Sequence, residues 1–242
     1  MPLDLVELDA TTDFPAIARC MFESHEVPEQ KFFEAFFPTL GDGGHQARED
    51  AIAECATRLA SWHAEDPTSY WQKVVDTDTG RIAGAALWNI CETDPFAEEH
   101  EMEVTWFPDG QARRFVEQFL DMYERPRARV GRRPQVYLFI LYTHPDYRRQ
   151  GVAQKCMNWG MKKADEMGVE MFLDSTPVGK PLYEANGFQV VEKTVIVPQT
   201  ENPDSDWKEA EAKIGHSEWW LMWRPAGGNY EEGVTVKPWA KK

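Results

Sequence analysis

A glycine-containing turn between an apolar stretch and a helical pattern is the first group of residues that could do chemistry. Val136-Tyr-Leu-Phe-Ile-Leu-Tyr142 is short and rich in β-branched and aromatic residues, which is typical of a strand buried on both faces. The turn Arg148-Arg-Gln-Gly-Val-Ala153 follows, and small or apolar residues then recur at helical spacing as far as Ala164. A helix start leaves backbone N–H groups unpaired and carries about half a positive charge, and Gly151 has no side chain to keep a ligand away. The pattern therefore predicts a site for a di- or polyphosphate.

The distribution of charge supports an anion site at this turn. The 242-residue chain has a net charge of -15, yet the segment from Arg125 to Lys163 contains ten Lys or Arg against one acid, Asp146. Removing the +9 of that segment leaves -24 for the rest of the chain. A basic segment in an acidic protein, centred on a helix start, is expected for a polyanionic ligand. Residues 125–134 of this segment are expected to form a basic connector, either a solvated loop or a contact to the cofactor.

Two motifs in this part of the chain resemble those of a known family. After another predicted strand, a short helix carries Tyr183 and is closed by Gly187. Arg148-x-x-Gly151-x-Ala153 resembles the (Gln/Arg)-x-x-Gly-x-(Gly/Ala) signature of the GCN5-related N-acetyltransferase (GNAT) superfamily, and Leu182-Tyr-Glu-Ala-Asn-Gly-Phe188 resembles its closing motif. The resemblance extends over about Val136 to Val191, a quarter of the chain.

The resemblance implies an α/β (α+β) fold, with a mixed, mostly antiparallel central sheet that is splayed between its fourth and fifth strands and has helices on both faces. The order of predicted elements agrees with it. They are a strand over 3–9, one or two helices within 16–37, a helix over 52–63, a hairpin of 70–75 and 81–90, a helix over 111–123, the strands and helices of the two motifs, and strands over 188–197 and 217–224. Residues 198–215 are expected to be a surface excursion. We expect one domain over 1–224, with a helical insert around 93–134 and a loosely attached tail over 225–242.

The resemblance also implies which residues bind acetyl-CoA. The backbone of residues 141–143 would face the acetyl group and pantetheine, and alternate amides of the turn would face the pyrophosphate. Thr176 stands where many members of the family have an asparagine that contacts the pantetheine. The implied cofactor-binding residues are Leu141, Tyr142, Thr143, Arg148, Arg149, Gln150, Gly151, Val152, Ala153 and Thr176.

The implied reaction is direct attack of a primary amine on acetyl-CoA, and it needs two proton transfers. An amine with a pKa near 10 lies about three pKa units, or roughly 4 kcal/mol, from its reactive neutral form at pH 7. A carboxylate, or a water chain ending at one, must take that proton. The resemblance places Tyr183 beside the sulfur, where it would meet the departing thiolate.

The general base is not assigned by the sequence. Some family members have histidines on the fourth strand, where this chain has Tyr137 and Phe139. Acids around the expected acceptor site are candidates, and none stands out: Glu92, Asp94, Glu101, Glu103 and Asp174. In the stretch from 93 to 134, three aromatic residues are candidates for lining an acceptor pocket: Trp106, Phe107 and Tyr123.

Composition limits the compartment and the partners. No apolar run reaches 18 residues and the N-terminus lacks a signal-peptide pattern, so we expect a soluble, cytoplasmic protein. The four cysteines have no paired spacing, which indicates reduced thiols and neither disulfides nor a metal site. The net charge of -15 argues against nucleic acid and anionic membrane surfaces. His63 falls on the apolar side of its predicted helix and is expected to be structural.

The sequence therefore favours an acetyl-CoA-dependent N-acetyltransferase acting on a small amine such as an amino sugar, polyamine, amino acid, drug or toxin. A protein or peptide N-acetyltransferase is the nearest alternative, and it would need an open groove. A non-catalytic acyl-CoA sensor with the same fold is a third. The presence of Tyr183 argues against a sensor, while the absence of an obvious base keeps that alternative open. The acceptor and the oligomeric state are not determined by the sequence.

Overall fold

The computed structural model describes residues 2–98 and 103–239. The chain divides into two compact units. The first consists of Met1–Gln30, Thr39–Ile90 and Tyr137–Lys163, and the second of Lys31–Pro38, Cys91–Val136 and Ala164–Lys242. The expected turn motif falls in the first unit, and the helix with Tyr183 falls in the second.

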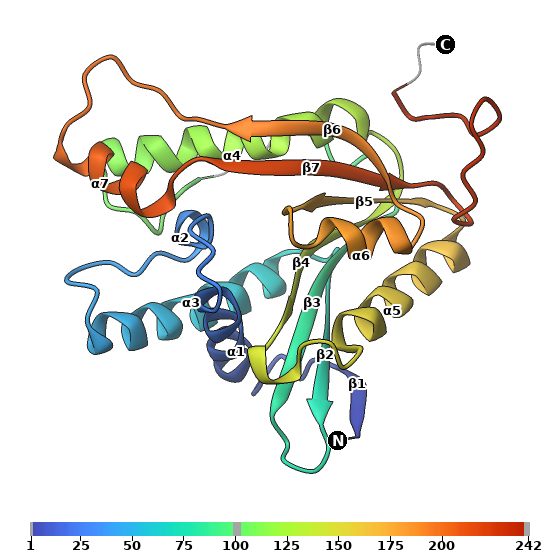
Figure 1. The fold of residues 1–242 in the computed structure, drawn as a ribbon, viewed down its shortest axis with the longest axis horizontal. Coiled ribbons are helices and arrows are strands. Elements are labelled where there is room, and N and C mark those ends of the chain that lie inside the picture. The colour runs from blue at the N-terminus through green and yellow to red at the C-terminus, as the bar shows by residue number, and fades with distance from the viewer. Residues whose placement is uncertain (1, 99–102, 240–242) are drawn as a thin grey trace. The chain divides into compact units, whose positions relative to one another are not determined.

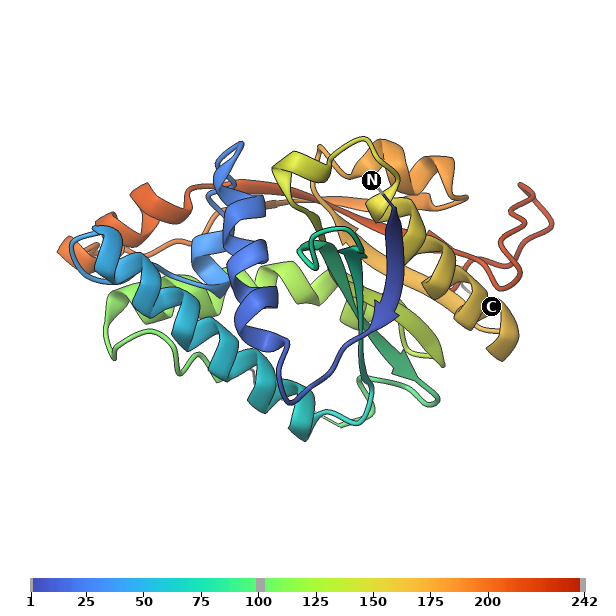
Figure 2. The same cartoon turned by 90° about the horizontal axis from the view of Figure 1, so that it is seen from below.

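The first unit is built on strands in the order β1-β2-β3-β4 (Figure 1). These strands are β1 (Leu3–Glu7), β2 (Ser69–Asp76), β3 (Ile82–Cys91) and most of β4 (Gln135–Thr143). The first three are paired antiparallel, with Leu5 opposite Val74 and Trp71 opposite Leu87. The helices are α1 (Phe14–Glu26), α3 (His45–Glu65) and most of α5 (Val152–Met167). Figure 2 shows α1 and α3 crossing each other and β1 beside β2.

A glycine lets α5 lie directly on β3. A Cβ atom built on Gly160 would lie 2.3 Å from Cη2 of Trp88, whose side chain is fully buried. The Trp88 and Trp159 rings are 6.2 Å apart, so the large indoles fill the space on both sides of the glycine. Gly84 has a similar role one turn earlier, since its Cβ would lie 2.4 Å from the Tyr142 carbonyl oxygen. These two glycines fix the distances from β3 to α5 and to β4.

The second unit is built on strands in the order β5-β7-β6. They are β5 (Glu170–Ser175), β6 (Gln189–Ile196) and β7 (Ser217–Arg224), all paired antiparallel, with Phe172 opposite Trp223. The helices are α2 (Phe33–Phe36), α4 (Gln111–Val130), α6 (Lys180–Ala185) and α7 (Ser205–Ile214). In Figure 1, α4 lies alongside β6 and β7, and α7 lies next to α4.

Aromatic side chains form much of the core of the second unit. The Tyr123 ring lies 4.8 Å from that of Trp219 and 5.7 Å from that of Phe36. The indole N–H of Trp106 donates to the Ala35 carbonyl at 3.0 Å, and Phe107 is buried. Trp106, Phe107 and Tyr123 were expected to line an acceptor pocket. That expectation is corrected, because their rings are buried in the packing of this unit.

The basic connector expected over 125–134 is also corrected, because α4 continues through Pro126 to Val130. A proline inside a helix loses one hydrogen bond and usually ends or bends it. Here Tyr123, Pro126, Arg127 and Val130 extend the buried face of the helix, so packing offsets the lost bond. The helix then closes with the N–H of Gly131 on the Arg127 carbonyl.

The surface excursion expected over 198–215 contains a packed helix. The Asp204 side chain accepts the N–H of Trp207 at 2.9 Å and so caps α7. Trp207, Ala210 and Ile214 recur on one face and are buried, and the Trp207 ring lies 5.1 Å from that of Phe115 on α4. The prediction was wrong because the many polar residues around Trp207 concealed this apolar face.

The remaining elements agree with the sequence. Both strands of the 70–90 hairpin, the helix break before Pro28, and the strands of the two motifs are confirmed. The fold class, a mixed and mostly antiparallel sheet with helices, is confirmed. The tail begins at Pro225, and its Tyr230 and Trp239 rings lie 6.2 and 5.3 Å from that of Trp223. In the described ranges, no helix combines the length and apolar character needed to cross a membrane.

Candidate functional site

The turn before α5 has a left-handed backbone at two positions. Arg149 has φ 63° and Gly151 has φ 83°. This region is costly for a residue with a side chain and is open to glycine. A Cβ built on Gly151 would meet no atom within 4 Å, so the space over this residue is open. The turn therefore exposes its backbone at Gly151.

The helix start at this turn has backbone donors. The bond from the Lys155 N–H to the Gly151 carbonyl, at 3.0 Å, is the first of the helix. The N–H groups of Val152, Ala153 and Gln154 precede it and lack a carbonyl one turn earlier in the helix. Together with the open Gly151, these donors give the turn the chemistry of an anion site.

The arginine that begins the motif holds the turn in place. The Nη2 atom of Arg148 donates to the Ser24 carbonyl at 2.8 Å, and its Nε donates to the Thr143 carbonyl at 3.3 Å. Gln150 donates from its amide to the Asp146 carbonyl at 2.9 Å. Arg149 is exposed. In the described structure Arg148 therefore bonds the backbone on either side of the turn.

At the end of β4, the predicted residues differ in burial. Tyr142 is buried and its hydroxyl donates to the Ile17 carbonyl of α1 at 3.0 Å, so its side chain belongs to the core. Leu141 and Thr143 are half-buried. If these residues contact a ligand, the backbone of Tyr142 must do so, since its ring is committed to the packing.

In the second unit the structure brings Thr176 and Tyr183 together around Gly179. The Gly179 N–H donates to Oγ1 of Thr176 at 3.3 Å, and a Cβ on Gly179 would lie 2.9 Å from Cε2 of Tyr183. The Tyr183 ring is buried and lies 6.1 Å from that of Phe188. Burial raises the pKa of Tyr183 well above its usual value near 10. Its hydroxyl therefore carries its proton at neutral pH.

The candidate bases fall into different settings. Asp94 accepts from Arg132 at 3.0 Å and from the Phe96 N–H at 2.8 Å. Burial raises the pKa of Asp94, but these two bonds outweigh it and lower the pKa overall. The Asp174 side chain is only 2% exposed, with Oδ2 3.9 Å from Nε of Arg127. Glu92 and Glu103 are exposed, and Glu101 lies outside the described residues.

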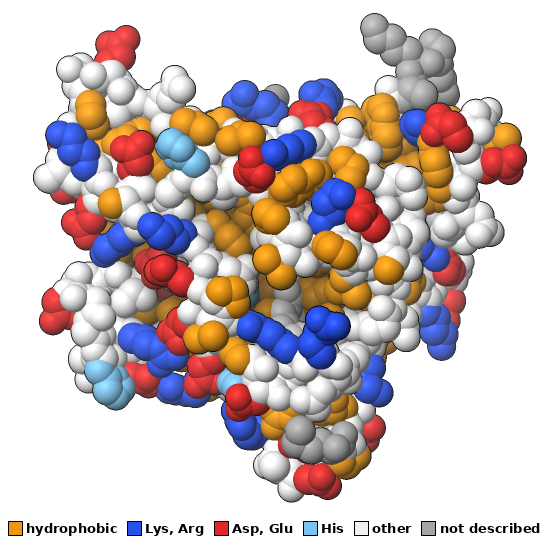
Figure 3. All heavy atoms as spheres, viewed as in Figure 1, with side chains coloured by type: hydrophobic (Ala, Val, Ile, Leu, Met, Phe, Trp, Pro, Cys, Tyr) orange, Lys and Arg blue, Asp and Glu red, His pale blue; other side chains and the backbone are white. Residues whose placement is uncertain are grey.

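Half of the basic segment is used inside the second unit. Arginines 125–133 each form an ion pair with an acid, and the pairs are Arg125–Asp121, Arg127–Glu124, Arg129–Glu192, Arg132–Asp94 and Arg133–Glu170. Figure 3 shows basic and acidic side chains interspersed over the face in view. The charge count from the sequence thus overestimated the positive charge available to a ligand, because these partners lie outside the counted segment.

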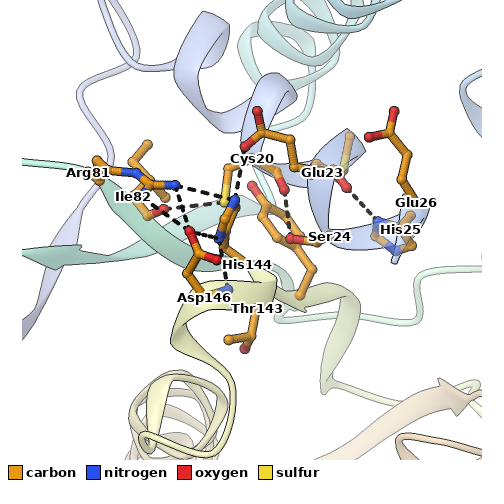
Figure 4. Close-up of polar contacts among 12 residues, drawn as sticks. Cys20, Glu23, Ser24, His25, Glu26, Arg81, Ile82, Thr143, His144 and Asp146 are labelled. Atoms are coloured by element: carbon orange, nitrogen blue, oxygen red, sulfur yellow. Dashed lines mark hydrogen bonds and ion pairs between the residues drawn. The ribbon is translucent and has the colours of Figure 1, made fainter. Parts of the chain in front are cut away.

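Sequence reasoning missed the residues that support the turn. In Figure 4, His144 lies among Glu23, Arg81 and Asp146. Its Nε2 atom is 3.1 Å from Oε2 of Glu23, and its Nδ1 accepts the Asp146 N–H at 3.1 Å. Glu23 and His144 are 121 residues apart, so no local pattern joins them. A histidine immediately before Pro145 at the end of a buried strand was the available signal.

The structure of this chain is similar to solved acetyltransferases. The family model described as "Acetyltransferase (GNAT) domain" matches residues 116–190. The structure titled histone acetyltransferase HPA2 and related acetyltransferase, from Corynebacterium glutamicum, is 18% identical, with 97% of this chain and 100% of that chain covered and a TM-score of 0.56. Arylalkylamine N-acetyltransferase 2 of Aedes aegypti is 14% identical, with 93% and 100% covered and a TM-score of 0.57. The polyamine N-acetyltransferase of Drosophila melanogaster is 14% identical, with 92% and 99% covered and a TM-score of 0.57. No curated protein matches the sequence.

Proposed function

We propose that this chain, whose residues 116–190 belong to the GNAT acetyltransferase family, transfers the acetyl group of acetyl-CoA to the primary amine of a small molecule. The observation that carries the proposal is the turn before α5, with its left-handed Gly151 and the backbone donors that follow it. A pyrophosphate is the part of acetyl-CoA that suits such donors. The expected ligands of the pantetheine are the backbone of Leu141 and Thr143 and the side chain of Thr176.

The reaction balances without a further co-reactant. The amine nitrogen attacks the thioester carbonyl, a C–N bond forms and the C–S bond breaks. The amine loses one proton to a base, and CoA leaves as a thiolate that takes up one proton. We assign Tyr183 to the leaving sulfur. Full proton transfer from a phenol of pKa 10 to a thiol of pKa about 8.5 is already uphill by roughly 2 kcal/mol. Burial raises the pKa of Tyr183 further, so its role is to donate a hydrogen bond that stabilises the thiolate.

Two observations favour a small amine as acceptor. Two of the similar structures carry the names of an arylalkylamine and a polyamine N-acetyltransferase. Outside the basic segment the chain is strongly acidic, which suits a cationic acceptor. The Corynebacterium structure carries a histone acetyltransferase title, and it keeps a protein acceptor as the competing class.

The test is thiol release from acetyl-CoA against a panel of primary amines, together with calorimetric binding of CoA. The panel includes arylalkylamines, polyamines, amino sugars, amino acids and a lysine-containing peptide. CoA binding with release that depends on a small amine supports the proposal. Release with the peptide alone indicates a protein acetyltransferase, and binding without release across the panel indicates an acyl-CoA sensor.

The turn itself is tested by Gly151→Ala. The added methyl meets no protein atom, but it occupies the space over the turn and pays the cost of a left-handed backbone, about 1–2 kcal/mol. We expect CoA affinity to fall by at least tenfold. Gly80→Ala is the matched control, because Gly80 has φ 75° and also has nothing within 4 Å. An equal loss of stability in both variants with unchanged CoA affinity would remove the turn from the site.

A further inference from the structure

The last turn of α1 is bonded at two points to the connection between β4 and α5. Glu23 meets Nε2 of His144 at 3.1 Å, and the Ser24 carbonyl accepts from Arg148 at 2.8 Å. Both contacts lie in the first unit and join residues more than 120 positions apart in the sequence. Figure 4 shows the His144 ring between the α1 residues and Asp146.

The contacts of the His144 ring fix its tautomer. The Asp146 N–H donates to Nδ1 at 3.1 Å, so Nδ1 is an acceptor and carries no proton in the neutral ring. Nε2 then carries the proton and donates to the Glu23 carboxylate. The same ring caps the 3-10 turn Pro145–Tyr147, which leads directly into the glycine turn. One side chain therefore both starts this connection and ties it to α1.

Charged neighbours favour this arrangement. Arg81 reaches Oδ2 of Asp146 from both Nη1 and Nη2 at 3.3 Å, and its Nη2 lies 3.4 Å from Nε2 of His144. Oδ2 of Asp146 is 3.6 Å from Nδ1 of His144. The His144 side chain is 10% exposed and that of Glu23 is 35% exposed. The bond to Glu23 is thus partly shielded from water, which strengthens it relative to a surface pair.

We propose that His144 and Glu23 are a positioning pair that sets the backbone of the turn at 149–153 for acetyl-CoA. The inference rests on the proposed function, since it assigns a role in that same site. Neither side chain is expected to touch the reacting atoms. Loss of the pair should raise the Kd of CoA and the KM of acetyl-CoA, and it should leave kcat within about twofold.

A purely structural role predicts a different result, and α1 offers a matched control. Glu26 lies three residues beyond Glu23 and pairs with Arg48 of α3 through both of its carboxylate oxygens. Removing Glu26 takes an ion pair from the same end of the same helix without touching the connection to α5. General loosening of α1 would therefore appear in Glu26→Ala as well as in Glu23→Ala.

The experiment compares Glu23→Ala, His144→Asn, Glu23→Gln and Glu26→Ala with the wild type in the full chain. Glu23→Ala keeps the His144 cap and loses the bridge. His144→Asn keeps a capping oxygen for the Asp146 N–H but is too short to reach Glu23. Both should weaken CoA binding about five- to tenfold, the effect of one partly buried hydrogen bond to a charge. Glu23→Gln retains an acceptor for Nε2–H and should stay within about twofold of the wild type, as should Glu26→Ala.

Unchanged CoA affinity in Glu23→Ala, an equal loss in Glu26→Ala, or a fall in kcat with an unchanged KM would each overturn the proposal. A second readout separates its failure from that of the proposed function. Hydrogen exchange of the 150–153 amides in the ligand-free protein should be faster in Glu23→Ala than in Glu26→Ala. If the wild type binds no CoA, the proposed function fails, and the exchange rates still decide whether the pair positions the turn.

Discussion

Tyr183 shows how burial changes the role of a residue that the sequence singles out. Its position in the closing motif is readable from the sequence, but its pKa is not. The ring is buried beside Gly179 and Phe188, and burial raises the pKa of the hydroxyl well above 10. A phenol of this kind is a good hydrogen-bond donor and a poor acid toward a thiol.

Tyr183→Phe should therefore reduce kcat and leave acetyl-CoA binding nearly unchanged. Loss of one hydrogen bond made to the departing thiolate predicts a decrease of about 10²-fold. Steady-state kinetics with calorimetric CoA binding measure the two effects separately. Tyr142→Phe is a suitable control, because that hydroxyl bonds the Ile17 carbonyl and should affect stability more than turnover. Normal turnover in Tyr183→Phe would exclude the assigned role.

His25 makes stability depend on pH. Its Nδ1 bonds the Met21 carbonyl at 2.7 Å, and burial, with a contribution from Arg148, lowers its pKa from 6.5 to about 4. The unfolded chain then binds more protons between these values, so the free energy of unfolding falls as the pH drops from about 6.5 toward 4. The loss is at most about 3 kcal/mol, since the ring keeps some contact with solvent.

The measurement is urea unfolding at pH 7.0, 5.5 and 4.5. His25→Gln retains a donor for the Met21 carbonyl and does not titrate, so its stability should fall less than that of the wild type over this range. Parallel pH profiles of the two proteins would show that another group is responsible.

The turn and the closing motif could be predicted residue by residue, but the supports of the site could not. Gly151 is visible in the sequence because a left-handed turn requires it. Glu23 and Ser24 are ordinary helix residues whose importance arises only when the fold brings α1 to the end of β4. The sequence contains no local pattern for such long-range contacts.

At the scale of elements, helix α4 and helix α7 show where local patterns mislead. Pro126 predicts a helix end, and the buried face at Tyr123, Arg127 and Val130 overrides it. The polar residues around Trp207 predict a loop, and three buried residues one turn apart make a helix instead. In both cases packing within the second unit decides the outcome, and packing is the information that a single sequence conveys least well.

The contact of α5 with β3 gives a prediction at this scale. In Gly160→Ala the new methyl would lie 2.3 Å from Trp88, in a core with no room to relax. We expect the free energy of unfolding to fall by about 1–3 kcal/mol despite the better helix propensity of alanine. Asn158→Ala, at an exposed position of the same helix, should change it by less than about 0.5 kcal/mol. Thermal unfolding of both variants measures the difference, and a stabilised Gly160→Ala would contradict the close packing.

For the molecule as a whole, the cysteines behave as the sequence predicted. Cys20, Cys55, Cys91 and Cys156 are all buried and none forms a disulfide in the described structure. Burial raises the pKa of Cys20 and of Cys156 to about 12, and it raises that of Cys55 as well. A thiol that stays protonated and has no access to solvent reacts slowly.

The native protein should therefore react with a chromogenic disulfide reagent at pH 8 only very slowly, and all four thiols should react once urea unfolds it. Absorbance at fixed time in the two conditions gives the count. A fast reaction of any thiol in the native protein would contradict its burial. Slow native reaction also means that released CoA can be followed in the same assay with little background.

The two bonds that join α1 to the connection before α5 also constrain energies. Ligands that contact these two elements would act on one mechanical piece of protein. If a ligand at the turn changes the affinity for a second ligand at the end of α1 by some factor, the second must change the affinity for the first by the same factor. Binding order then leaves the total free energy unaltered, and synergy between the two substrates measured from either side must agree.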